Sequence, residues 1–118
     1  MIGLKSFCGN TNMSRLLNKV SDFLKLVLST GVRQGKVLLT SASNIQVKAL
    51  AEIAYNLLSL PLPAKLDRVV KKYCRILKKV SDKTTKLTEK LKIIARNVSK
   101  ILLCLKASKK IILDLIRK

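Results

Sequence analysis

Apolar residues recur every three or four positions along most of this chain, which is the spacing that places them on one face of an α-helix. The pattern predicts helices over residues 14–28, 44–58, 65–80 and 85–117. Residues 32–40 do not alternate as a strand does, so a short helix is expected there as well, although Gly35 weakens it. Together these segments predict an all-α fold, a small bundle of four to five amphipathic helices with a long basic C-terminal helix.

Glycine, proline and a capping residue mark where several of these helices begin and end. Gly31 follows the last apolar position of the first helix, as C-terminal glycines do. Ser43 or Asn44 is expected to cap the next long helix. Pro61 and Pro63 end that helix, because proline lacks an N–H group and disfavours helical backbone in the residue before it.

The domain organisation follows from these boundaries. A chain of 118 residues is long enough for one domain with a modest core. Residues 1–12 hold glycines and asparagines without an apolar period, and they are predicted to form a flexible N-terminal arm. Residues 13–118 are predicted to form a single helical domain, with apolar helices over 13–60 and basic helices over 64–118.

The last predicted helix is too long for a bundle of this size. A continuous helix over residues 85–117 would span about 50 Å at 1.5 Å per residue. We therefore expect it to bend near Ala107 and Ser108 or to pack against another subunit.

The formal charge of +19 is the second strong feature, since 25 Lys and Arg residues stand against 6 Asp and Glu. A small domain stays soluble with a charge of about 2 to 8, and a larger excess destabilises the folded state by self-repulsion. Residues 1–63 carry a net +5, whereas residues 64–118 carry +14. The C-terminal half is therefore expected to bind a polyanion, either nucleic acid or an anionic membrane.

Catalysis is not expected, because the chain contains no histidine and so lacks the usual general base and the commonest metal ligand. Cys8, Cys74 and Cys104 are odd in number and far apart, which is typical of reduced thiols rather than of a zinc site or a disulfide framework. Lys48 and Glu52, four residues apart, are interpreted as a surface ion pair or a helix-cap partner, not as an acid–base couple. No catalytic residue, metal or cofactor is predicted.

A membrane-spanning helix and a secretory signal are not expected either. A spanning helix needs about 18 or more apolar residues, and the longest clear apolar run, Ile101–Leu105, lies between Lys100 and Lys106. Residues 1–8 lack a cleavage site, so a secretory signal is not expected.

Candidate nucleic-acid contacts lie along the basic helices between residues 65 and 100. Thirteen cations fall in this stretch with three acidic residues, whereas an ordinary solvated helix face mixes the two signs. A cation at nearly every turn suits duplex DNA, which carries one negative charge per about 1.7 Å. The predicted binding residues are Lys65, Arg68, Lys71, Lys72, Arg75, Lys78, Lys79, Lys83, Lys86, Lys90, Arg96 and Lys100.

The composition of this face favours contact with phosphate over contact with bases. Most of its cations are lysines, which act as point charges, whereas paired contacts to guanine favour arginine. Aromatic residues are few, and Tyr73 is predicted to be buried on an apolar stripe, so stacking on exposed rings is not expected. The leading hypothesis is therefore a non-enzymatic protein that binds and condenses nucleic acid, above all duplex DNA, without sequence preference.

Three other partners stay open at this point. Helices with lysines on one face and Leu or Ile on the other also bind anionic lipid, so a membrane-active protein is the main alternative. An acidic protein partner, such as a capsid interior, would neutralise the same charges. Self-association into a homo-oligomer is also open.

Residues 32–94 carry a family resemblance. The segment reads VRQGKVLLTSASNIQVKALAEIAYNLL, then PLP, then KLDRVVKKYCRILKKVSDKTTKLTEKLKII. It resembles the small basic proteins encoded by Maverick/Polinton elements and adintoviruses, which have been compared with the adenovirus core protein X. The matching residues are Lys48, Ala49, Leu50, Glu52, Ile53, Ala54, Tyr55, Asn56, Leu57, Leu58, Pro61, Leu62, Lys71, Lys72, Tyr73, Arg75 and Leu77. The resemblance implies an origin in a DNA virus or transposon and a virion-core or genome-condensing role. The expected location is a virion core or host nucleus, and otherwise the cytoplasm.

Overall fold

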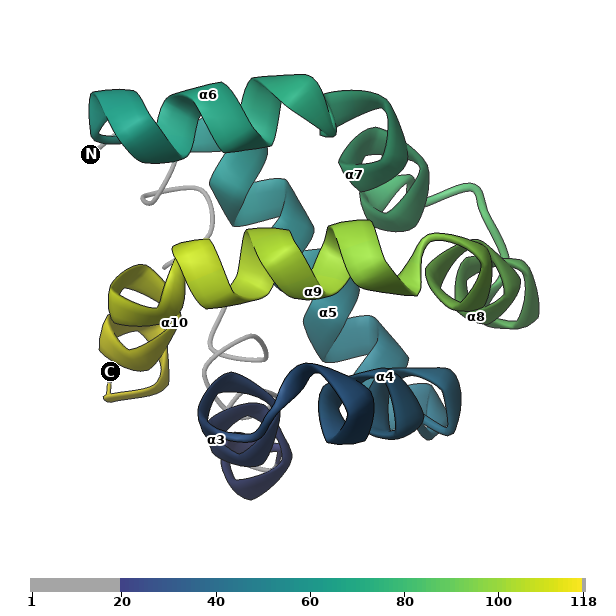
Figure 1. Ribbon diagram of the computed structural model, residues 1–118. Helices are drawn as coiled ribbons and strands as arrows, with labels where there is room; N and C mark the ends of the chain where they lie inside the picture. Colours follow the sequence, from purple (N-terminus) through teal and green to yellow (C-terminus); the bar gives the residue numbers. More distant parts are fainter. Residues whose placement is uncertain (1–19, 118) are drawn as a thin grey trace.

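The computed structural model describes residues 20–117, which fold into eight α-helices without a strand in that range (Figure 1). The helices are α3 (Ser21–Ser29), α4 (Val32–Thr40), α5 (Asn44–Ser59), α6 (Ala64–Lys72), α7 (Cys74–Ser81), α8 (Leu87–Arg96), α9 (Val98–Ala107) and α10 (Lys109–Arg117). The all-α prediction is confirmed, whereas the bundle of four to five helices is wrong. The predicted arm over residues 1–12 and the first predicted helical turns lie outside the described residues.

Helix α5 is the longest element, and local sequence signals set both of its ends. Ser43 forms a capping box: its Oγ accepts a hydrogen bond from the N–H of Gln46 at 3.3 Å, and its own N–H donates to Gln46 Oε1 at 2.9 Å. Leu60 is extended, and Pro61 follows it. The structure therefore selects Ser43 over Asn44 as the cap and confirms the proline stop.

Removing this cap is expected to destabilise the fold. Ser43→Ala takes away the acceptor for a first-turn N–H group, so the free energy of unfolding is expected to fall by about 1 kcal/mol in urea titrations. Ser99→Ala, at an exposed position in α9, is the control and is expected to change stability by less than about 0.5 kcal/mol. Equal effects of the two substitutions would contradict the capping role.

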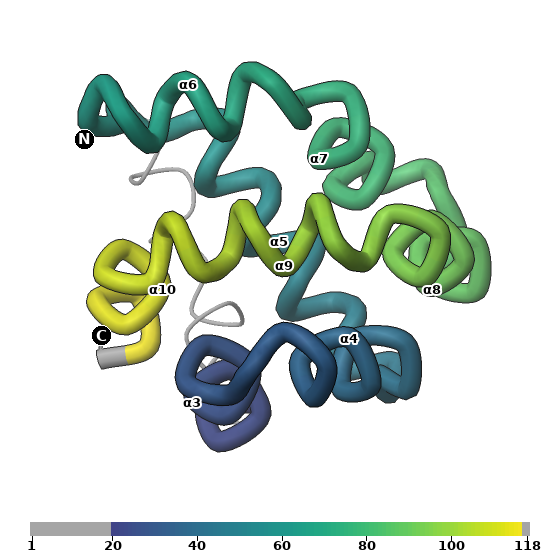
Figure 2. The backbone as a smooth tube through the Cα atoms, viewed as in Figure 1, coloured from purple at the N-terminus to yellow at the C-terminus, as the bar shows by residue number. Residues whose placement is uncertain are grey.

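The other helices surround α5. Figure 2 shows α9 crossing in front of α5, with α8 and α10 at the two ends of α9. Helices α6 and α7 lie on one side of α9, and α3 and α4 lie on the other side. Each described helix contributes to one aliphatic core, as the scarcity of aromatic residues requires. The largest fully buried side chains are Leu24, Leu39, Ile53, Leu57, Ile94, Leu102 and Ile112.

Gly35 has a packing role that explains its place inside α4. A Cβ atom at this position would lie 2.9 Å from both terminal methyl carbons of Leu102 in α9. Its missing side chain therefore lets α4 approach α9 closely, which offsets the low helix propensity of glycine.

Single residues divide the two basic helices that the periodicity predicts over residues 65–80 and 85–117. Tyr73, Asn97 and Ser108 each have φ between −101° and −120° and ψ between 18° and 27°, which places them in the bridge region between helix and strand. The predicted bend near Ser108 is confirmed. The prediction of one long basic C-terminal helix over residues 85–117 is wrong, because the chain also turns at Asn97 and the first helix of this region begins at Leu87.

Polar side chains account for two of these corners. The Asn97 side-chain amide donates to the carbonyl of Ile93 at 2.9 Å, and Ser108 Oγ donates to the carbonyl of Cys104 at 2.7 Å. Such bonds to the preceding turn compete with the regular backbone ladder and bend helices. The basic helices therefore fold back around the core, and the largest dimension of the molecule is 35 Å instead of the length of one straight helix.

Candidate nucleic-acid interface

The predicted binding residues are exposed with one exception. Eleven of the twelve have exposed side chains, whereas Lys90 is 7% exposed. Lys90 differs from the others because of the way α8 is rotated about its axis: Lys90 and Ile94 are buried, and Leu87 and Leu91 are half-buried. Lys90 therefore does not lie on the outer face with the other eleven.

Part of the exposed set lines one open groove of about 560 Å³, which we call the basic groove. The groove forms where the breaks at Tyr73 and Asn97 come together, so residues far apart in the sequence share it. Its cations come from the end of α6, the start of α7 and the first turn of α9. These four groove cations are Lys71, Lys72, Arg75 and Lys100, and the remaining lining residues are Tyr73, Cys74, Ile76 and Asn97.

Contacts within the chain engage two of the groove cations weakly. Lys71 Nζ lies 3.1 Å from Asp67 Oδ2, but the two side chains are 76% and 41% exposed, and such pairs contribute at most about 1 kcal/mol. Lys72 Nζ lies 5.5 Å from the centroid of the Tyr73 ring, within cation–π distance. The side chains of both lysines are exposed, so a phosphate can reach their ammonium groups.

Tyr73 packs against the core, as its place on the apolar stripe predicts, but it is only partly buried and also lines the basic groove. Its side chain is half-buried because Tyr73 is the corner residue between α6 and α7. It is the one aromatic residue among those that line the groove in the described structure. A single ring can contact a base, but it does not provide the row of rings that single-strand binding uses.

A second hollow, of about 430 Å³, lies between α5 and the first turn of α8, and we call it the lysine hollow. The turn before α8 is fixed by Asp82, whose carboxylate accepts hydrogen bonds from the N–H of Thr84 at 2.9 Å and from Thr84 Oγ1 at 2.7 Å. These bonds lower the pKa of Asp82. The lining residues are Lys48, Ala51, Glu52, Lys83, Thr85, Lys86, Leu87 and Lys90.

Glu52 is the acidic residue of the lysine hollow. Burial raises its pKa, while the charges of Lys83 and Lys90 act in the opposite direction. The interpretation of Lys48 and Glu52 as an ion pair is wrong, since no such pair forms among the described residues. The fold instead places Glu52 near lysines from the turn before α8 and from α8 itself, which sequence spacing alone does not reveal.

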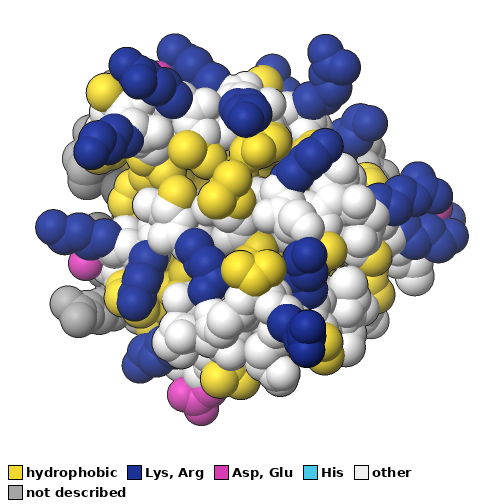
Figure 3. All heavy atoms as spheres, in the orientation of Figure 1, with side chains coloured by type: hydrophobic (Ala, Val, Ile, Leu, Met, Phe, Trp, Pro, Cys, Tyr) yellow, Lys and Arg dark blue, Asp and Glu magenta, His cyan; other side chains and the backbone are white. Residues whose placement is uncertain are grey.

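The predicted cations do not form one uninterrupted strip. Figure 3 shows an apolar band between α6 and α9 on this face, bordered by Lys and Arg side chains. Lys65 lines an apolar groove of about 320 Å³ between α6 and the corner that joins α9 to α10, and Lys110 lines it too. Four further predicted residues are exposed without lining any of these hollows: Arg68, Lys78, Lys79 and Arg96.

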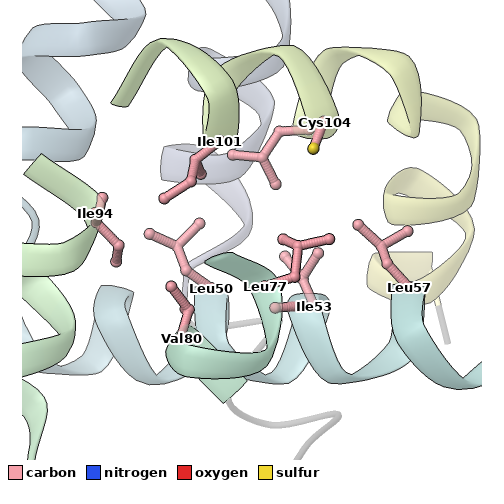
Figure 4. A pocket seen from close by; sticks show the side chains of 10 residues that line it. Leu50, Ile53, Leu57, Leu77, Val80, Ile94, Ile101 and Cys104 are labelled. Atoms are coloured by element: carbon pink, nitrogen blue, oxygen red, sulfur yellow. The ribbon is translucent and has the colours of Figure 1, made fainter. Parts of the chain in front are cut away.

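The interior offers no room for a ligand at the point where α5, α7, α8 and α9 meet. The cavity there measures about 10 Å³ and is lined by aliphatic side chains and Cys104 (Figure 4). A cavity of this size barely admits one water molecule, and its apolar walls leave it dry. Burial raises the pKa of Cys104 to about 11, so its thiol stays protonated and unreactive near neutral pH.

Most positive charges of the described chain have no acidic partner. Two ion pairs form within residues 20–117, between Lys71 and Asp67 and between Lys92 and Glu89, and both are exposed. The excess charge therefore stays on the surface, where it favours an external polyanion.

Within residues 20–117, no group of three or more acidic or cysteine side chains is placed to hold a metal ion. No helix in the described range has the length and apolar character needed to cross a membrane. Comparison with family profiles, curated proteins and solved structures found no match to this chain.

Proposed function

We propose that this protein binds nucleic acid, above all duplex DNA, through phosphate charge and without sequence preference, and that it is not an enzyme. The basic groove is the observation that carries the proposal. Four cations from three helices surround one open groove, and none of its described lining residues is acidic. A concave surface with one sign of charge concentrates the opposite charge, and nucleic acid supplies that charge densely.

The chemistry of the groove supports contact with phosphate. Three of its four cations are lysines, which bind phosphate as point charges. A base-reading surface would present several arginine or amide side chains in fixed orientations, and the groove contains one arginine and one asparagine. Binding through these residues is therefore proposed to tolerate any sequence.

The biological role that we propose is genome condensation. A protein with a formal charge of +19 neutralises part of the backbone charge of any nucleic acid that it coats, and this lets duplex segments approach one another. The resemblance to basic proteins of Maverick/Polinton elements and adintoviruses is consistent with the same role, in a virion core or a host nucleus. Self-association would strengthen condensation by linking bound segments.

An anionic membrane surface is the second candidate ligand. The apolar band between α6 and α9 and the half-exposed side chain of Leu103 favour it, because lysines border the band as they border the apolar face of interfacial helices (Figure 3). The burial of Leu66 and Val70 weakens the membrane candidate, because these apolar side chains of α6 pack inside the protein and are not available to lipid. Binding to vesicles with anionic headgroups distinguishes the two ligands.

Salt titration tests the proposed function. If the four groove cations each contact a phosphate, the slope of log affinity against log salt concentration is expected to be about −3.6 or steeper, at about −0.9 per contact. Two unrelated duplexes of equal length are expected to bind within about threefold of each other, because phosphate contacts carry no sequence information. Fluorescence anisotropy at several salt concentrations measures both quantities.

Two outcomes would contradict the proposal. A flat salt dependence would show that backbone charge is not the basis of binding. Weak DNA binding together with tight binding to anionic vesicles would favour the membrane candidate.

A further inference from the structure

The lysine hollow contains a lysine, Lys90, whose side chain is largely buried and whose ammonium group has no close partner among the described residues. Lys90 is 7% exposed, yet no hydrogen bond or ion pair within 4.0 Å involves its ammonium group among the described residues. Its Nζ is not among the fully buried, unpaired polar atoms of the described residues, so the ammonium group borders the open hollow and is accessible to a ligand. A ligand with negative charge would provide the missing partner.

The start of α8 adds backbone donors to the same place. Lys86 is the N-cap residue of α8, and its side chain makes no capping hydrogen bond. Lys86, Leu87 and Lys90 all line the hollow, so the first turn of this ten-residue helix borders it. The N–H groups of a first helical turn and the positive end of the helix dipole both favour an anion.

The charge of the hollow selects the class of anion. Four lysines and one glutamate line it, which leaves an excess of three positive charges. A phosphate group carries about −1.5 to −2 near neutral pH and three oxygen acceptors, so it can engage several lysines and backbone N–H groups at once. A carboxylate has one charge and two oxygens, which leaves more of the lysine charge uncompensated.

We propose that the lysine hollow is a phosphate-binding site, with Lys90 at its base and Lys48, Lys83 and Lys86 around its rim. The site is separate from the basic groove: the groove begins at the start of α7, and Lys83 follows the end of that helix. Helix α7 has eight residues, so the two sites are about 12 Å apart along its axis. The phosphate can belong to a nucleic-acid strand or to a small phosphate compound.

Titration with inorganic pyrophosphate tests this site. In the K83Q/K86Q variant, the affinity measured by calorimetry is expected to fall about tenfold, since two rim charges are lost. The matched control is K78Q/K79Q, which removes two exposed cations that line no hollow, and its affinity is expected to change less than twofold. Amide NMR signals of the first turn of α8 are expected to shift on binding, and they locate the ligand.

Two further variants each remove one charge of the lysine hollow, at Glu52 or at Lys90. Glu52→Gln removes the one negative charge of the hollow and is expected to raise pyrophosphate affinity several-fold. Lys90→Gln is expected to lower it, with circular dichroism as the check that the variant folds. Because K83Q/K86Q changes exposed residues alone, the proposal stays testable if K90Q does not fold.

The outcomes separate this site from the proposed function. Equal losses in K83Q/K86Q and K78Q/K79Q, or amide shifts outside α8 and the preceding turn, would overturn the site even if DNA binding keeps its salt dependence. If added duplex DNA displaces bound pyrophosphate from the wild-type protein, a nucleic-acid phosphate occupies the hollow. If pyrophosphate stays bound at saturating DNA, the ligand is a small phosphate compound.

Discussion

Glutamine at all four groove-cation positions is expected to weaken duplex DNA binding by about three and a half orders of magnitude near 0.1 M salt. The variant is K71Q/K72Q/R75Q/K100Q. Each cation that contacts a phosphate releases about one counterion, and at this salt concentration each release contributes a factor of roughly 8 to the affinity. The slope of the salt dependence is expected to become shallower by about 3.6 in the same titration.

The control removes the same number of charges elsewhere. The variant K25Q/R33Q/K36Q/K109Q changes cations of α3, α4 and α10, none of which lines the basic groove. Its affinity is expected to stay within about tenfold of wild type, because long-range attraction weakens without loss of direct contacts. Equal losses in the two variants would show that diffuse charge, and not the groove, binds DNA.

Ile94→Ala is expected to lower the free energy of unfolding by about 3 to 4 kcal/mol. Ile94 is fully buried in α8, and its side chain reaches the point where α5, α7 and α9 meet (Figure 4). The substitution enlarges a cavity that is already present and removes contacts to three helices. A loss of this size is a large share of the about 5 to 15 kcal/mol that stabilises a typical domain, and urea unfolding measures it.

Leu103→Ala provides the comparison. Leu103 is 50% exposed on α9, so its truncation removes little buried area and is expected to cost less than about 1 kcal/mol. If both substitutions destabilised the protein equally, the assignment of Ile94 to the core and of Leu103 to the surface would be wrong.

Local signals made much of the helix content predictable. The end of α5 follows from two prolines, its start from Ser43, and the short helix α4 from the spacing of its apolar residues. These signals act within a few residues, so they can be read without knowledge of the rest of the chain.

The corners at Tyr73 and Asn97 were not predictable in this way. Neither is a glycine or proline, and the apolar spacing continues through both positions. At Asn97 the side-chain amide bonds the carbonyl of Ile93, but such a bond also forms within regular helices, so asparagine at this position does not by itself predict a turn. The bend at Ser108 was predictable because a continuous helix over residues 85–117 would be too long for a bundle of this size.

The candidate site also has parts that were predictable from the sequence and parts that were not. Lys71, Lys72 and Arg75 lie within five residues of one another, so their proximity follows from the sequence even though the helix is broken at Tyr73. Lys100 joins them through the corner at Asn97, and the burial of Lys90 depends on how α8 rotates against the core. The lysine hollow as a whole combines α5 with α8 and had no signal in the sequence apart from its lysines.

The one-residue corners make spacing along the chain as important as residue type. An α-helix advances about 100° per residue, and a corner of one residue contains no slack to absorb a change in length. One extra residue after Asn97 would therefore turn Leu102 and Leu105 toward solvent and bring polar or exposed positions of α9 inward. Related chains are expected to exchange surface lysines freely while tolerating insertions mainly before Ala64 and between Asp82 and Lys86, where extended or turn segments separate the helices.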